Sequence, residues 1–273
     1  MLEVVLSSIG SATLVAVGLW LSQTWIKERL IASIRIETER ELTKLKSDLD
    51  SASQRLKDLA LAGNSANAQV EGALLEHRIA AVKAVWEAVL SWQTVSAATM
   101  MVSVLPDDWL KNNASHPGTQ STFEQLLKNA DHMNFMKRQN ETELVRPFLS
   151  EQIWALYAAY HSFLSARLVK ASLLTIHGID HAGVLSRFNE RELVQKSAPP
   201  DILKIYDNNA YTCTEPYLRY LREELLSQFR EFLSGHRAGN LALQDAAKIL
   251  HAAQDLAAKS SATAQEIQNV KNA

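Results

Sequence analysis

The sequence predicts an all-α protein with an N-terminal transmembrane helix, a coiled-coil neck and a cytoplasmic helical bundle. Three observations predict this class. No charged residue lies between Glu3 and Lys27, only 9 Gly and 6 Pro interrupt 273 residues, and alanine and leucine are abundant while β-branched runs are short. Few helix breakers and many strong helix formers favour helix nearly throughout. No alternating β pattern and no long repeat stands out in the sequence.

The first predicted element, residues 1–26, is a membrane anchor. Its uncharged run covers 23 residues, and at about 1.5 Å per residue such a helix spans about 35 Å, more than a hydrocarbon core of about 30 Å. Trp20 and Trp25 lie beside Lys27, as interfacial anchors do. Two alternatives, a cleaved signal peptide and a buried core helix, fit less well. The start lacks basic residues, the cleavage site is poor, and core helices are seldom apolar over so long a run.

Small side chains mark one face of this predicted span. Ser8, Ala12 and Ala16 are spaced by four residues, so two such helices could approach each other closely on that face. The first interpretation is that small residues only dilute a passive anchor. The alternative is that the span takes part in helix packing through these three residues.

Basic residues predict the orientation of the span. Lys27, Arg29, Arg35 and Arg40 come after the uncharged run, and no Lys or Arg precedes it. The positive-inside rule then places the N-terminus outside and the C-terminus in the cytoplasm of a single-pass membrane protein, with the lipid bilayer as its partner. The single cysteine, Cys213, agrees, because an extracellular domain of this size more often carries disulfides.

Residues 27–62 read as one exposed helix that leaves the membrane. Apolar residues recur there at alternating spacings of three and four, the pattern of a coiled-coil seam; they are Leu42, Leu45, Leu49, Ala52, Leu56 and Leu59. The pattern predicts a homo-oligomer formed through this segment, and a shared membrane anchor favours association by raising the local concentration. The alternative is an amphipathic helix that packs on its own bundle.

The Gly, Asn and Ser cluster of residues 63–72 predicts a hinge before a bundle at residues 73–236. A first helix is expected over 73–105, a polar loop over 106–118, and a helix from the capping box at Ser121 to about Arg138. An aromatic-rich helix is expected over 148–176, broken structure over 179–200, and helices from about 200 to Pro216 and on to Leu233. An Ala-rich helix and tail fill residues 237–273.

Candidate chemistry is sparse. The sequence has no phosphate-binding loop, nucleophile elbow or zinc-protease motif, and one cysteine excludes a thiolate zinc site. His177-Gly-Ile-Asp-His181 is the nearest group to a ligand cluster, although histidines are also favourable after a helix end. Net charge is −2 with no strongly basic half, so no nucleic-acid partner is expected. We expect no catalytic residues, no metal and no cofactor.

Two sets of aromatic residues are candidates for a binding surface. Trp154, Tyr157, Tyr160 and Phe163 recur at helical spacing, which is typical of a core. A second set, Tyr206, Tyr211, Tyr217 and Tyr220, clusters near a loop, which favours an interface.

One short segment, Arg230-Glu-Phe-Leu-Ser-Gly-His236, resembles the Arg-to-His motif of HEPN ribonucleases. The resemblance covers seven residues, and about one such spacing is expected by chance. It implies a nuclease with Arg230 and His236 in the active site. Gly235 precedes His236 and is expected to end the helix before it.

The expected function is therefore non-enzymatic. The sequence favours a scaffold or regulatory protein that displays a cytoplasmic bundle, with a protein partner on that bundle. A membrane effector that acts through oligomerisation of its transmembrane helix is the first alternative, and a HEPN-like nuclease is the second.

Overall fold

The described part of the chain is helical. The computed structural model describes residue 40 and the ranges 43–55, 58, 66–92, 95–128, 130, 132–177, 180–185, 188–208, 210–234 and 240–272. No β-strand occurs in these ranges, and their helices form a bundle, which confirms the all-α class. The chain divides into two units, Met1–Asp50 and Ser51–Ala273. The boundary falls inside the helix predicted over 27–62, of which 43–55 is helical.

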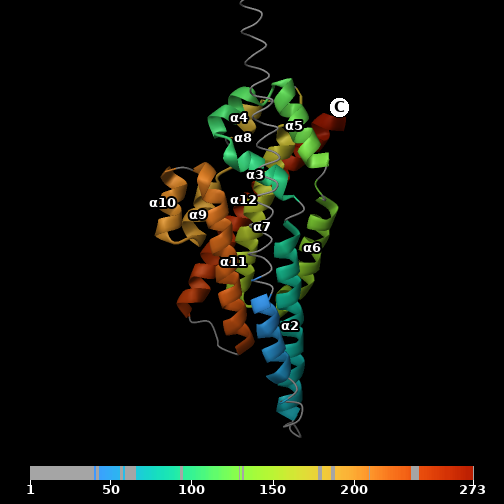
Figure 1. The fold of residues 1–273 in the computed structure, drawn as a ribbon, viewed down its shortest axis with the longest axis vertical. Helices are drawn as coiled ribbons and strands as arrows, with labels where there is room; N and C mark the ends of the chain where they lie inside the picture. Colours follow the sequence, from blue (N-terminus) through green and yellow to red (C-terminus); the bar gives the residue numbers. More distant parts are fainter. Residues whose placement is uncertain are drawn as a thin grey trace, which may run out of the picture. The chain divides into compact units, whose positions relative to one another are not determined.

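The described part of the second unit contains eleven labelled α-helices and one 3₁₀ helix (Figure 1). In chain order they are α2 (Ala66–Ser91), α3 (Ser96–Val104), α4 (Asp107–Asn113), α5 (Pro117–Lys128), α6 (His132–Val145), η2 (Arg146–Phe148), α7 (Glu151–Leu173), α8 (His181–Leu185), α9 (Glu190–Ser197), α10 (Pro200–Asn208), α11 (Ala210–Ser234) and α12 (Asn240–Asn272).

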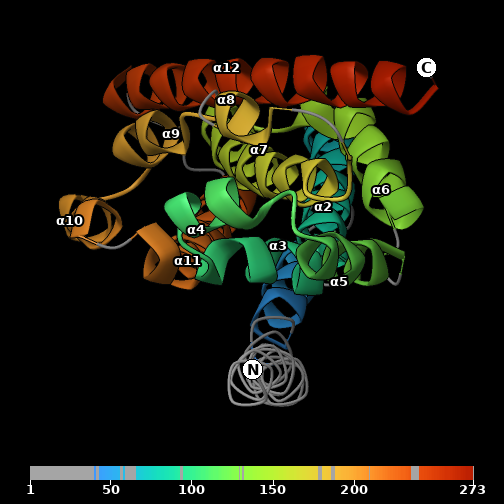
Figure 2. The ribbon, with the colours of Figure 1, turned by 90° about the horizontal axis from the view of Figure 1, so that it is seen from above.

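Helix α7 is the centre of this unit. Its most extensive packing is against α12, which lies along it in Figure 2, and it also contacts α2, α3, α5, α9 and α11. The aromatic residues predicted on this helix are all buried, namely Trp154, Tyr157, Tyr160 and Phe163. The Ser150 hydroxyl accepts a hydrogen bond from the Ile153 N–H and caps the helix N-terminus. These four aromatics are therefore core, as their spacing predicted.

Several helix boundaries differ from those expected. Helix α2 begins at Ala66, inside the segment expected as a hinge, because the next residues include alanine, glutamine and glutamate, which favour helix. The helix expected over 73–105 is two helices, since the chain turns at Val95 between α2 and α3. Pro106 precedes a short helix, α4, where a loop was expected. Pro117 begins α5 ahead of the Ser121 capping box, because proline suits a first helical turn.

Two further differences concern the C-terminal half. Pro216 lies inside α11 and does not end it, so the expected boundary there was wrong. The segment expected as broken over 179–200 holds two short helices, α8 and α9. The Ala-rich tail is a helix as far as Asn272, and it buries a stripe of mostly small side chains; they are Ala246, Ile249, Ala252, Ala253, Leu256, Ser260 and Thr263.

Candidate functional site

The most unusual group in the described core is a buried carboxylate between two buried cations. The Glu190 side chain is 1% exposed and those of Arg167 and Lys170 are 5% exposed. Arg167 Nη2 lies 2.6 Å from Glu190 Oε2, and Lys170 Nζ lies 2.8 Å from Glu190 Oε1. We call these three residues the buried ion cluster. Buried charges are tolerated in proteins only when they are paired in this way.

Two helix ends position the buried ion cluster. Arg167 and Lys170 are three residues apart on α7, and Lys170 lies in its last turn. Glu190 is the first residue of α9. A cation near a helix C-terminus and an anion near an N-terminus both complement the helix dipoles. The cluster therefore joins the last turns of α7 to the start of α9.

The buried ion cluster has two cations but only one carboxylate, and an aromatic ring lies against each cation. The Arg167 guanidinium carbon lies 5.1 Å from the centre of the Phe163 ring, and Lys170 Nζ lies 5.5 Å from the centre of the Phe188 ring. Such faces attract a cation. Burial raises the pKa of Glu190, but Arg167 and Lys170 outweigh it, so the net direction is downward and the group stays ionised at neutral pH. A paired, ionised carboxylate shielded from solvent holds helices together; it is poorly placed to accept a proton from a substrate.

Two neighbouring polar groups tie α9 and α10 to α11. The Tyr217 hydroxyl lies 2.6 Å from Ser197 Oγ, and the Cys213 thiol donates to the Ile202 carbonyl at 3.5 Å. Burial raises the pKa of Cys213 to about 11, with Arg167 opposing it, so the side chain is a thiol at neutral pH. Tyr217 is fully buried, so this member of the second tyrosine set belongs to the core, whereas Tyr206 and Tyr220 are partly exposed.

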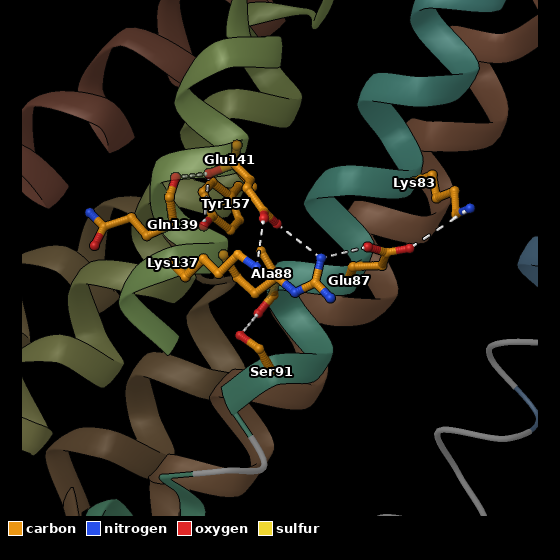
Figure 3. A network of polar contacts seen from close by, with 10 residues as sticks. Lys83, Glu87, Ala88, Ser91, Lys137, Gln139, Glu141 and Tyr157 are labelled. Carbon is orange, nitrogen blue, oxygen red and sulfur yellow. Dashed lines mark hydrogen bonds and ion pairs between the residues drawn. The ribbon is translucent and has the colours of Figure 1, made fainter. Parts of the chain in front are cut away.

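A second polar network lies between α2 and α6 (Figure 3). Arg138 Nη1 lies 2.9 Å from both Glu87 Oε2 and Glu141 Oε2. Lys83 and Lys137 extend it at 3.9 Å from Glu87 and 3.8 Å from Glu141. All five side chains are at least a third exposed, so solvent screens their charges and each pair adds little to stability.

The predicted ligand and nuclease residues are not assembled into a site in the described ranges. His177 and Asp180 are exposed, His181 is buried, and no group of three or more metal-ligating side chains occurs among the described residues. Arg230 is exposed on α11, which ends at Ser234, and His236 lies outside the described residues.

The predicted oligomerisation and membrane residues are only partly described. Leu45 and Ala52 are buried within the single chain and Leu49 is partly buried. Leu42, Leu56 and Leu59, together with Ser8, Ala12 and Ala16 of the predicted span, lie outside the described residues. In the described ranges, no helix combines the length and the apolar character that a bilayer crossing needs.

The sequence offered little to identify the buried ion cluster. Its members are Arg167, Lys170 and Glu190, and the spacing of Arg167 and Lys170 predicts only that they share a helix face. Their partner comes twenty residues after Lys170 and beyond a helix end, where periodicity carries no information.

No family model, curated protein or solved structure matches this chain at a significant level.

Proposed function

We propose that this protein is a single-pass, membrane-anchored scaffold or regulatory protein that displays its helical unit in the cytoplasm. The observation that carries the proposal is the uncharged run of residues 4–26 with Lys27, Arg29, Arg35 and Arg40 after it. A run of this length suits a bilayer crossing, and the basic residues at its end favour cytoplasmic placement of the rest of the chain.

The chemistry of the described unit supports a role in binding. The Glu190 carboxylate is paired with two cations, and Cys213 is a buried thiol with a raised pKa. These two side chains are thus engaged in the packing of helices. The displayed helical unit would then offer its surface to a protein partner.

Self-association through residues 27–62 is the second part of the proposal. The coiled-coil spacing and a shared anchor support it. Ala52, which belongs to the second unit, is buried within one chain, and this favours the alternative of intrachain packing. The mass of a fragment that contains the segment separates the two.

An effector that acts through its transmembrane helix is a second candidate, favoured by one observation. Ser8, Ala12 and Ala16 would place small side chains on one face of the span, where helix backbones can approach closely. A passive scaffold needs only attachment to the membrane, whereas an effector needs this particular helix face.

Replacing residues 4–26 with an unrelated transmembrane helix tests the proposed function in cells whose phenotype depends on the protein. The scaffold proposal expects full activity from the replacement, provided that membrane location and protein level are unchanged. The paired change Ala12→Leu with Ala16→Leu keeps the span apolar but fills the small face. Loss of activity in both variants, with location intact, would reject the passive scaffold in favour of the effector.

A further inference from the structure

We propose that His161 makes the contact between α6 and α7 sensitive to acid, so that protonation of its imidazole promotes local opening of α6. The imidazole ring is stacked on Phe135 of α6, with centroids 5.0 Å apart and planes inclined by 8°. The ring of Tyr157, one turn earlier on α7, also contacts the imidazole, with 6.0 Å between their centroids. His161 is therefore the link through which an aromatic group of α6 packs on α7.

The surroundings of His161 suit a neutral ring. Its Nδ1 atom lies 3.4 Å from Ser165 Oγ, and its Nε2 atom is covered and has no hydrogen-bond partner among the described residues. A protonated imidazole carries two N–H donors, so one of them would be buried without an acceptor. Burying an unpaired donor on a cation is costly, and the attraction of the Phe135 and Tyr157 rings compensates only in part.

Among the described residues, no charged group contributes to the pKa shift of His161, which burial alone produces. From α6 the facing side chain is Phe135, which does not titrate. From α7 it is Tyr157, whose pKa burial raises to about 12, so it remains a neutral phenol. Of the charged α6 residues, Lys137, Arg138 and Glu141 belong to the network with α2, and the exposed Glu143 acts on Tyr157, whose pKa it raises. Burial accordingly lowers the pKa of His161 from 6.5 to about 4.

The remaining attachment of α6 explains why it is the element that would open. The helix packs mainly on α2, and one solvent-screened ion pair, Arg138–Glu87, joins the two helices (Figure 3). Toward α7, its described side chains contribute the Phe135 ring and a hydrogen bond between the Thr142 and Tyr157 hydroxyls, 3.0 Å apart. An element held by few buried contacts opens more easily than the core around α7.

The direction of the pH effect is set by proton linkage. Because the pKa of His161 is lower in the folded chain than in the opened form, the contact is fully stable above pH 6.5 and weakens as the pH falls from 6.5 toward 4. The opened form binds one additional proton over that interval. The population in which α6 is open should therefore rise about tenfold for each pH unit.

Hydrogen exchange of the full chain in detergent micelles tests this inference. After correction for intrinsic exchange rates, protection of the α6 amides should fall about tenfold per pH unit below 6.5. His161→Phe keeps a stacked ring that cannot be protonated. In this variant the protection of the α6 amides should therefore lose the tenfold fall per pH unit that the imidazole causes. His77→Phe is the matched control, because the exposed His77 also stacks on a phenylalanine, Phe148 at 4.7 Å, and its slope should equal that of the wild type.

Equal slopes in the wild type and His161→Phe would overturn the inference. If His161→Phe does not fold, the imidazole of the wild-type chain can be titrated by NMR with labelled histidine. A midpoint well below 6.5 for His161 supports the inference, and a midpoint near 6.5 overturns it.

Discussion

Lys170, in the last turn of α7, lies 2.8 Å from the carboxylate of Glu190, the first residue of α9. The pair lies where the negative C-terminal end of α7 meets the positive N-terminal end of α9. Arg167, one turn earlier on α7, binds the same carboxylate. Twenty residues separate the two, and the three charges are buried together where α9 packs on α7.

Glu190→Gln should strongly destabilise the protein. The change keeps the shape of the side chain but leaves Arg167 and Lys170 as buried cations without a counter-charge, which costs about 3–5 kcal/mol of unfolding free energy. Chemical denaturation followed by circular dichroism measures this loss. Glu192→Gln is the control, since Glu192 is two residues away and pairs with Lys196 at 2.8 Å on the surface. Similar shifts for the two variants would show that the buried ion cluster has no special role.

Acid should weaken the same contact. The pKa of Glu190 is lower in the folded chain, so its contribution is present above the usual carboxyl range and is lost as the pH falls through the lowered pKa. The stability of Glu190→Gln should therefore depend less on pH in strong acid than that of the wild type. Denaturation midpoints measured over a series of acidic buffers give the pH dependence of stability for the wild type and for Glu190→Gln. Parallel curves would contradict a lowered pKa of Glu190 in the folded chain.

Cys213 should be unreactive in the folded chain. It is 1% exposed and burial raises its pKa to about 11, so little thiolate is present at neutral pH and reagents cannot reach it. An aromatic disulfide reagent at mildly alkaline pH should label it slowly in buffer and rapidly in denaturant. A Ser121→Cys variant, with the new thiol at an exposed position, provides the reactive reference. Rapid labelling of the folded wild type would contradict the burial of Cys213.

The stripe of small residues on α12 should not tolerate a larger side chain. Ala253 is fully buried on a helix that packs against α7 and α9, so Ala253→Leu overfills the contact and should cost about 1–3 kcal/mol. Thermal denaturation measures the loss. Ala258→Leu adds the same atoms at an exposed position of α12 and should leave the midpoint nearly unchanged. Equal midpoints for the two variants would mean that α12 is loosely packed.

Local patterns predicted much of this helical unit. The spacing of its aromatic residues identified the core of α7, where Trp154, Tyr157, Tyr160 and Phe163 are all buried. Helix boundaries were less well predicted at proline, which can either end a helix or lie within one. Pro216 was expected to end a helix but lies inside α11, whose surroundings override its local preference.

The buried contacts between distant segments could not be predicted in the same way. Arg167, Glu190 and Cys213 come from three helices, and their proximity depends on how α9 and α11 fold back on α7. A periodic pattern within one helix contains no information on such pairing. The same holds for His161, whose partner Phe135 comes from α6.

The coiled-coil seam predicts that a fragment beginning at Lys27 associates, whereas one beginning at Ala66 does so less. Leu45→Asp with Leu49→Asp would place charges in the seam and should reduce the mass of the longer fragment to that of a monomer. Light scattering measures these masses. A monomeric long fragment before any substitution would show instead that residues 27–62 pack within their own chain.

The membrane anchor is the central claim of this account, and protease protection of the full chain in intact cells tests it most directly. A C-terminal epitope should be resistant to added protease and become sensitive once the membrane is permeabilised, and the chain should leave the membrane fraction only with detergent. Deleting residues 4–26 should release it into the soluble fraction. A C-terminal epitope cleaved in intact cells, or a full-length chain that is soluble without detergent, would contradict the account.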